Sequence, residues 1–363
     1  MKYKYLFMEE TLKNMVVVDL FCGAGGLHIG FEQAGFKIGL CADNNSLVER
    51  THKFNFPNIP FTNKDIRNIN SEEIYGVLGE SEVDVLIGGP PCQGFSTIGK
   101  RSSSDIEKRT LKDERNTLVL EYIRLINELQ PKYFIMENVK GILTMDKGMF
   151  IEGIKEELGK TKYKFGIKLI NMADYGVPQM RERVFIIGNR LGHEIEFPPK
   201  SHSQNEENGL LPWENCWKVI EDLSTIEEDK EFNHVPLKHT EKNIERYKLI
   251  PEGGRLPEDS LPPELYRKNF GNTYKRLSRT NPALTMVPGN DAFPIHPILN
   301  RSLTVREAAR IQTFPDWMIF QGNRRQQGHQ VGNAVPPMFS KILANHIKQK
   351  LLIEEPKTLV SAK

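Results

Sequence analysis

The sequence of 363 residues predicts an α/β fold: a mostly parallel, doubly wound sheet with one antiparallel strand, joined to a smaller and irregular domain. Apolar runs of strand length alternate with helical patterns over the first 190 residues, and this rhythm fails from residue 191 to about residue 299. Strands are predicted at 163–172 and 181–188, near the end of the alternating region. The turn between them is too short for a crossover between parallel strands. One strand must therefore be reversed.

Length and composition fit a globular chain of two domains. Hydrophobic residues make up 39% and charged residues 26%, which is ordinary for such proteins. No apolar run approaches the roughly 18 residues that span a bilayer, and the charged start lacks a secretory leader pattern. We expect a cytoplasmic protein without membrane contact. The predicted domains are 1–190 and 191–299, with a return to the first domain at 300–353 and a flexible tail at 354–363.

Charge and cysteine usage restrict the partners further. Residues 201–233 hold nine acidic residues against two lysines, whereas residues 234–280 hold ten lysines or arginines against six acidic residues. Such segregation suits a surface that faces a polyanion, although charge runs are usually only solvated faces.

The four cysteines are scattered without a Cys-x-x-Cys pair. This argues against a zinc site or a disulfide framework, so we expect a reducing compartment and no metal.

The first elements form a βαβ unit with an acid at its end. A buried strand at 15–20 runs into the glycines of residues 23–26, a helix follows to Gly35, and a second strand at 37–43 ends in Asp43. Glycines allow a ligand to approach the backbone, and a carboxylate at this place can accept hydrogen bonds from ribose hydroxyls. The unit predicts an adenosine-containing cofactor. Asp65 follows a third short strand, where it is either an adenine contact or an ordinary turn residue.

Cys92 lies in a proline-rich turn directly after a buried strand at 83–87. Ligands of open α/β sheets bind at the carboxyl edge of the strands, and Pro90 and Pro91 restrict the backbone that leads to this cysteine. A buried structural cysteine is the alternative. A basic polar segment at 97–116 follows and has the length of a lid or binding loop.

The remaining elements place further polar residues at the same edge. A helix at 118–129 ends before Pro131, and the strand at 132–136 leads directly to Glu137. Because the strands are parallel, we expect Cys92 and Glu137 to face one crevice. In the last part of the chain, Thr304 and Glu307 form a predicted capping box at a helix within 301–312, and a C-terminal helix is predicted at 338–352.

Six blocks of this sequence, in order, resemble the DNA (cytosine-5)-methyltransferase family of bacterial restriction-modification systems. The resemblance runs from about residue 15 to residue 347. The blocks lie at 19–26, 89–96, 137–139, 179–183, 301–315 and 330–336. The resemblance implies the class I S-adenosylmethionine-dependent methyltransferase fold, with residues 191–299 as a target-recognition domain.

The resemblance also implies a reaction and the residues that perform it. S-adenosylmethionine would supply a methyl group to C5 of a cytosine that is flipped out of a specific duplex DNA sequence. Cys92 would add to C6, Glu137 would handle the proton at N3, and Arg183 would hold O2. Arg181, in the same paired-arginine block, is a further implied catalytic residue. The implied cofactor residues are Phe21, Gly23, Gly25, Asp43, Asp65, Ile66, Pro90, Leu118, Asn333 and Val335. The implied DNA contacts are Gln93, Ser96, Arg101, Gln179, Arg276 and Arg279.

One departure from the family and two alternative functions stay open at this stage. The family commonly has Glu in place of Asp43, often with a bulky residue in place of Asn44, which leaves the contacts at these two positions open. An RNA (tRNA) cytosine methyltransferase is the nearest alternative. A dinucleotide-dependent oxidoreductase fits the sequence less well than either methyltransferase. The glycines lack the spaced Gly-x-Gly-x-x-Gly pattern, and the Pro-Pro-Cys turn would have no explanation. We expect a monomer associated with the nucleoid, with a restriction endonuclease of the same specificity as a partner outside any stable complex.

Overall fold

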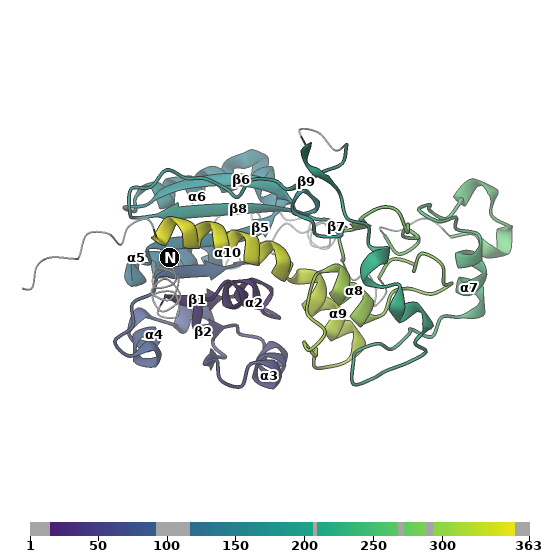
Figure 1. Cartoon of the computed structure of the whole chain (residues 1–363), viewed down its shortest axis with the longest axis horizontal. Helices are drawn as coiled ribbons and strands as arrows, with labels where there is room; N and C mark the ends of the chain where they lie inside the picture. Colours follow the sequence, from purple (N-terminus) through teal and green to yellow (C-terminus); the bar gives the residue numbers. More distant parts are fainter. Residues whose placement is uncertain (1–14, 92–116, 206–208, 268–271, 288–292, 353–363) are drawn as a thin grey trace, which may run out of the picture.

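The computed structural model describes residues 15–91, 117–205, 209–267, 272–287 and 293–352. It consists of a lobe built on a large sheet and a smaller lobe that adjoins one end of it (Figure 1). The predicted Cys92, Gln93, Ser96 and Arg101, together with the loop at 97–116, lie outside the described residues. No helix of the described residues is long and apolar enough to cross a membrane.

The central sheet has seven strands in the order β3-β2-β1-β4-β5-β8-β6. All neighbouring strands are parallel except at β8, which is antiparallel to both β5 and β6. The single reversed strand and the doubly wound order confirm the predicted fold class. The strands are β1 (Val16–Leu20), β2 (Lys37–Ala42), β3 (Phe61–Thr62), β4 (Val85–Gly88), β5 (Tyr133–Val139), β6 (Lys164–Asn171) and β8 (Glu182–Asn189).

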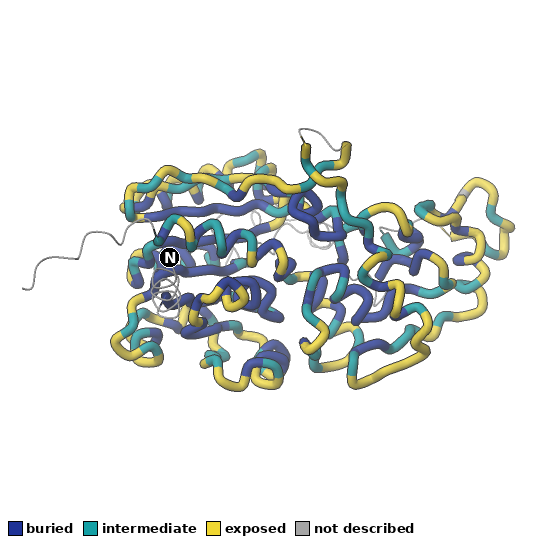
Figure 2. Tube along the Cα trace, in the orientation of Figure 1, coloured by how far each residue is buried: buried dark blue, intermediate teal, exposed yellow. Residues whose placement is uncertain are grey.

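Helices cover both faces of this sheet, and alternate strand residues point into two separate cores. On one face α2 and α10 lie side by side across the strands (Figure 1), while α4, α5 and α6 cover the other face. The strands β1, β4 and β5 are buried almost throughout, and so is α2 up to Phe31; the central sheet accordingly shows as buried trace in Figure 2. The helices are α2 (Gly26–Gln33), α3 (Ser46–Asn55), α4 (Ser71–Leu78), α5 (Thr117–Leu129), α6 (Met149–Gly159) and α10 (Pro337–Leu352).

The strand order creates a switch point between β1 and β4. From β1 the chain proceeds outward to β2 and β3, whereas β4 begins the other half of the sheet. Crossovers that leave in opposite directions open a crevice at the carboxyl ends of these two strands. The residues after β1 and after β4, which include the glycine loop and the Pro-Pro-Cys turn, therefore start from the two sides of one crevice.

The smaller lobe has a core of its own and little regular structure. It contains α7 (Glu241–Lys248), α8 (Val305–Ile311), α9 (Arg324–Asn333) and the short strand β11 (Ala283–Leu284). The paired strands β9 (His202–Ser203) and β10 (Leu211–Pro212) lie instead beside the segment that follows β6 in the sheet lobe (Figure 1). Strand β11 pairs with β7 (Gln179–Met180), which precedes β8, and so joins the two lobes. The core that holds side chains of α8 and α9 contains Cys216 and Phe293 of this lobe, and also Ala24, Ile29 and Phe56 of the sheet lobe. The chain returns to the sheet only with α10.

Local sequence signals account for most helix ends. Thr304 and Glu307 form the predicted capping box at the start of α8, with both of its hydrogen bonds present. Asn323 and Gln326 form a second capping box at α9, a helix that the sequence analysis did not predict. Helix α4 was also not predicted, although Asn70 caps it with a hydrogen bond to the amide of Glu73.

Candidate active site

Glu137 and Arg183 form an ion pair near the carboxyl end of β5. Glu137 lies within β5, and Arg183 lies opposite Val139 on the antiparallel strand β8. The distance from Arg183 Nε to Glu137 Oε1 is 2.9 Å, and their side chains are only 13% and 11% exposed. Reversal of β8 is what brings the arginine to this end of the sheet, because a parallel strand would present its other end here.

Burial sets the proton affinity of Glu137. Desolvation raises the pKa of this carboxyl group above its usual value, because it penalises the charged form, while the nearby guanidinium groups of Arg183 and Arg181 act in the opposite direction. The net shift is upward. The site therefore holds a carboxylic acid that keeps its proton at a higher pH than an exposed glutamate and that faces a fixed cation.

The end of β4 lies directly beside this carboxyl group. A β-carbon at Gly89 would lie 3.1 Å from Glu137 Oε2, so the backbone passes the carboxyl group closely. The side chain of Asn138 donates a hydrogen bond of 2.9 Å to the carbonyl oxygen of Pro90. The backbone two residues before Cys92 is thus tied to the strand that carries Glu137. This hydrogen bond of Asn138 was not predicted from the sequence, although the place of Asn138 in the 137–139 block is a signal for a role at the site.

Arg181 connects the sheet to the last part of the chain. Its side chain is fully buried, and Nη2 lies 3.4 Å from the carbonyl oxygen of Asn333. Its Nε and Nη1 have no hydrogen-bond partner among the described residues. Burial holds the pKa of this guanidinium well below its usual value. Arg181 thus places unpaired buried donors next to the Glu137 and Arg183 pair.

The glycine loop after β1 has the backbone shape of a ligand cradle. Phe21, Gly23 and Gly25 all adopt positive φ angles, of 57°, 51° and 88°. A β-carbon at Gly23 would meet no atom of the described residues within 4 Å, so these residues leave open space above the loop. Asp43 Oδ2 accepts a hydrogen bond of 3.1 Å from the amide of Gly23. Burial raises the pKa of the Asp43 carboxyl group.

Asp65 and Ile66 lie at the start of a short 3₁₀ helix after β3. Asp65 accepts hydrogen bonds from the backbone and from two side-chain nitrogens of Arg67, and this arginine lowers the pKa of the carboxyl group. Ile66 is 5% exposed and packs in the core beneath. Leu118, in the first turn of α5, packs against the same core. Ile66 and Leu118 thus belong to the same core, while the Asp65 carboxyl group is hydrogen-bonded to Arg67.

Helix α2 begins in close contact with the segment that precedes α10. A β-carbon at Gly26 would collide with the carbonyl oxygen of Val335, which is itself buried, and Asn333 is exposed nearby at the end of α9. Loop residues 21–26 and residues 333–335, far apart in sequence, thus meet at the predicted cofactor site.

This contact yields a stability prediction. Gly26→Ala should lower the free energy of unfolding by about 1–3 kcal/mol, because the added methyl group must displace backbone. Gly76→Ala, in α4 with no atom within 4 Å of the new carbon, should instead raise it by about 0.5–1 kcal/mol. Urea unfolding of both variants measures the difference. Equal midpoints would contradict a rigid approach between the two segments.

The comparisons with known proteins decide the family. The sequence model of the C-5 cytosine-specific DNA methylase family matches residues 15–349. The Type II methyltransferase M1.HphI of Haemophilus parahaemolyticus is 34% identical, covering 92% of this chain and 87% of its own length. The chain belongs to the C-5 cytosine-specific DNA methylase family.

Further relatives agree with this assignment. The Type II methyltransferase M.DdeI of Desulfomicrobium norvegicum is 33% identical, with 92% of this chain and 88% of the relative covered. A solved E. coli structure, described as a prophage-encoded DNA modification methyltransferase, superimposes with a TM-score of 0.74 at 26% identity. It covers 94% of this chain and all of the other. The family model, these relatives and this structure thus each match more than nine-tenths of the chain of this cytosine-5 DNA methylase.

The predicted DNA-contacting residues of this DNA methylase fall into three environments. Gln179 is fully buried, donates to Gln312 Oε1 at 2.6 Å and accepts from the amide of Met286. Arg276 is 5% exposed, and its side-chain nitrogens are engaged by protein oxygens. Arg279 is half exposed and pairs with Glu252 at 2.9 Å. Gln179 and Arg276 are thus bonded within the protein, and of the predicted DNA contacts among the described residues Arg279 is the accessible one.

The environment of Arg276 explains why sequence alone does not reveal its burial. Its guanidinium group donates five hydrogen bonds of 2.7–2.9 Å. The acceptors are the carbonyl oxygens of Tyr247, Ile250, His296 and Leu299 and the side chain of Asn300. Arginine is the residue suited to such a fan of donors, and a surface arginine and a buried one look alike in a sequence.

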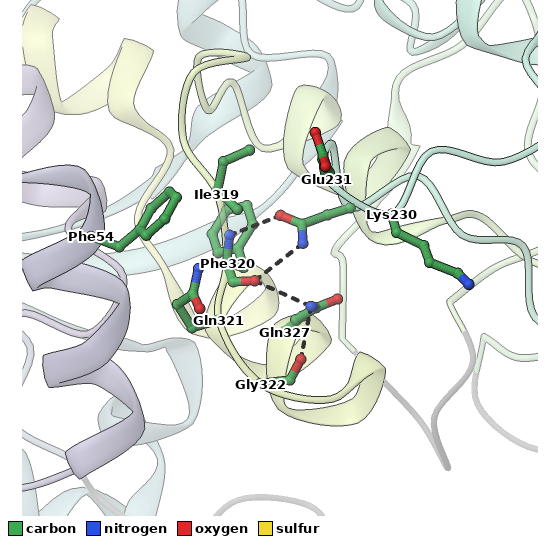
Figure 3. Close-up of a pocket in the computed structure, with 9 residues that line it drawn as sticks. Phe54, Lys230, Glu231, Ile319, Phe320, Gln321, Gly322 and Gln327 are labelled. Atoms are coloured by element: carbon green, nitrogen blue, oxygen red, sulfur yellow. Dashed lines mark hydrogen bonds between the residues drawn. The ribbon is translucent and has the colours of Figure 1, made fainter.

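A separate cavity of about 380 Å³ lies between α3 and the turn that precedes α9. Figure 3 shows Phe54 on one side and Phe320, Gln321 and Gln327 on the other. The amide group of Asn233 joins the backbone of Phe320 in its wall. None of the residues that line this cavity belongs to the predicted site of the methylase, so its lining supplies no group for the chemistry at Glu137.

Proposed function

We propose that the protein transfers a methyl group from S-adenosylmethionine to C5 of a cytosine within a specific duplex DNA sequence, through covalent addition of Cys92. The observation that carries the proposal is the buried pair of Glu137 and Arg183, placed beside Gly89 at the start of the turn that contains Cys92. An acid, a cation and a cysteine at one strand edge match what the attack on a cytosine ring requires.

Every bond that forms in the proposed reaction is matched by a bond that breaks. The Cys92 thiolate forms a bond to C6, which moves electron density to C5. C5 then takes the methyl group from the sulfonium donor, which leaves as a thioether. Loss of the C5 proton and cleavage of the bond between sulfur and C6 restore the aromatic ring and the thiolate. A base stacked in a duplex is out of reach for this attack, so the cytosine must leave the helix.

Glu137 and Arg183 stabilise the negative charge that develops at two atoms of the cytosine ring. Addition at C6 pushes negative charge toward N3 and O2 of the ring. A protonated Glu137 can donate to N3 as this charge develops, and its raised pKa favours that form. Arg183 supplies a fixed positive charge for O2, and its contact of 2.9 Å with the Glu137 carboxyl group keeps the two side chains next to each other.

The loop after β1 and the end of β2 suit the methyl donor. The open space above Gly23 admits a ligand close to the backbone. The Asp43 oxygens accept from the amides of Gly23 and Asn45 and keep lone pairs for ribose hydroxyls. Ile66, Leu118 and Val335 would provide apolar walls, with Phe21, Gly25, Pro90 and Asn333 as further contacts. When bound, the donor supplies an activated methyl group.

The smaller lobe would read the DNA. Its accessible Arg279, together with Gln93, Ser96 and Arg101 from the Pro-Pro-Cys segment, are the proposed DNA contacts. The relatives named as Type II methyltransferases support a modification enzyme of a restriction-modification system. A restriction endonuclease of the same specificity would then act on the same sequence without a stable complex, and a monomer in the cytoplasm would suffice because one base needs one site.

A transfer assay tests the proposal. The protein is incubated with S-adenosylmethionine labelled on the methyl group and with duplex DNA, and the DNA is digested to nucleosides. Label should appear in 5-methylcytosine, Cys92→Ser should reduce it to background, and Cys216→Ala, at a buried cysteine of the smaller lobe, should retain it. Transfer to tRNA in preference to duplex DNA would instead support the RNA alternative. Equal labelling by the wild type and Cys92→Ser would refute covalent catalysis by Cys92.

A further inference from the structure

A cluster of metal-ligating side chains lies beneath the glycine loop, and no step of the proposed reaction uses it. His28 on α2, Cys41 on β2 and His52 on α3 are 0%, 0% and 2% exposed. One potential ligand atom from each of the three lies within 4.8 Å of the others. Asp19, on β1, is fully buried beside them.

The distances inside the cluster match those between ligands of one ion. His28 Nδ1 lies 3.4 Å from Cys41 Sγ and 3.0 Å from Asp19 Oδ2. Zinc binds nitrogen and oxygen at about 2.0–2.2 Å and sulfur at about 2.3 Å, so neighbouring ligands of a tetrahedral ion are roughly 3.2–3.6 Å apart. The His28–Cys41 pair is at this spacing, the His28–Asp19 pair is slightly closer, and no separation among the ligand atoms of His28, Cys41 and His52 exceeds 4.8 Å.

Several polar atoms of the cluster have no protein partner. Both ring nitrogens of His52, Nε2 of His28 and Oδ1 of Asp19 are buried without a hydrogen bond among the described residues. A buried polar group without a hydrogen-bond partner destabilises the fold by about 1–3 kcal/mol. Four such atoms in one cluster therefore indicate that a ligand binds there. The rings of Phe56 and Phe61 pack against these histidines, and the shell is therefore apolar.

We propose that His28, Cys41 and His52, with Asp19 as a fourth group, bind a structural zinc ion. A thiolate and two imidazoles are ligands that zinc prefers over magnesium or calcium, which take oxygen. Four protein groups in a closed apolar shell fit a structural site, since a catalytic one keeps a position open. Cys-x-x-Cys spacing is absent because the ligands come from four elements that meet only in the fold.

The ion would fix the geometry of the proposed cofactor site. Cys41 precedes Asp43 by two residues, and the ring of His28 lies so close to Gly25 that a β-carbon there would collide with it. A metal that joins β1, α2, β2 and α3 therefore holds the glycine loop and Asp43 in one arrangement. Its removal should loosen the loop without removing any group that contacts the cytosine.

Metal binding by the full-length protein tests this site directly. The protein is stripped with a chelator, incubated with excess Zn²⁺ or Co²⁺, and freed of loose metal by gel filtration. We expect about one ion per chain, an absorption band of a thiolate bound to Co²⁺, and a higher melting temperature with Zn²⁺ than after chelation. The band arises from cysteine ligation and is independent of methyl transfer.

Three variants locate the ion. Cys41→Ser should abolish the Co²⁺ band, and His52→Phe, which preserves an aromatic ring of the same shape, should lower the zinc content well below one. Cys216→Ala is a matched control at a buried cysteine outside the cluster and should leave both unchanged. Absence of a stoichiometric ion in the wild type, or an identical Co²⁺ band in Cys41→Ser, would overturn the proposal. The wild-type measurement decides even if a variant fails to fold.

Discussion

Glu137→Gln should lower kcat for DNA methylation by about 10²–10⁴-fold, the usual contribution of a positioned acid. Glutamine keeps the size and the hydrogen-bonding oxygen but has no proton to give to N3. The change should act on kcat more than on KM for DNA, because the charge on the ring develops during the reaction. Steady-state kinetics with a methylatable duplex measures both constants.

The pH profile separates proton donation from a merely structural effect of Glu137. Burial raises the pKa of this carboxyl group, so the active protonated form persists above the usual range of a glutamic acid and is lost as the pH rises through the raised pKa. The wild-type kcat/KM should fall along this limb, and Glu137→Gln should lack it. Glu182→Gln, at an exposed glutamate that pairs with Lys140 on the same edge, is the control and should keep the wild-type profile.

Arg276→Ala should destabilise the smaller lobe by at least about 3 kcal/mol. The substitution leaves four carbonyl oxygens and one amide oxygen without their donor, and each buried orphan costs about 1–3 kcal/mol where water cannot reach it. Denaturant unfolding, followed by tryptophan fluorescence, should show the loss. A DNA-reading arginine would instead change DNA binding and leave unfolding unaltered.

Arg279→Ala is the matched control, three residues further along the same segment. Its side chain is 51% exposed and its ion pair with Glu252 is at the surface, where such pairs contribute little. Unfolding should change by less than about 1 kcal/mol, while affinity for the target duplex should fall. Equal unfolding curves for Arg276→Ala and the wild type would mean that the hydrogen bonds around Arg276 are dispensable.

The sheet lobe could be predicted because its signals are local. Buried strands are short apolar runs, and a mostly parallel sheet with one reversed strand follows from where helices or only short turns intervene. The approach of Glu137 to Gly89 follows in turn, since carboxyl ends of neighbouring parallel strands share an edge. Recognition of the family blocks added Arg183, whose position depends on the reversed strand.

The parts that sequence missed depend on contacts between distant segments. The burial of Arg276 and Gln179 was not predicted, because their hydrogen-bond partners are far away in the sequence, up to 133 residues for Gln179. The cluster of His28, Cys41 and His52 has no spacing pattern, because each ligand comes from a different element. Helix α9 was missed since its residues, rich in Gln, Arg and Gly, carry no apolar stripe.

A duplex made with 5-fluorocytosine at every cytosine position tests the central claim most directly. Fluorine cannot leave C5 as the proton does, so the bond between Cys92 and C6 should persist after methyl transfer. We expect a protein–DNA complex that survives denaturing electrophoresis, requires S-adenosylmethionine, and yields a peptide linked through Cys92. Absence of such a complex from a preparation that methylates ordinary DNA, or a linkage at another residue, would contradict covalent catalysis by Cys92.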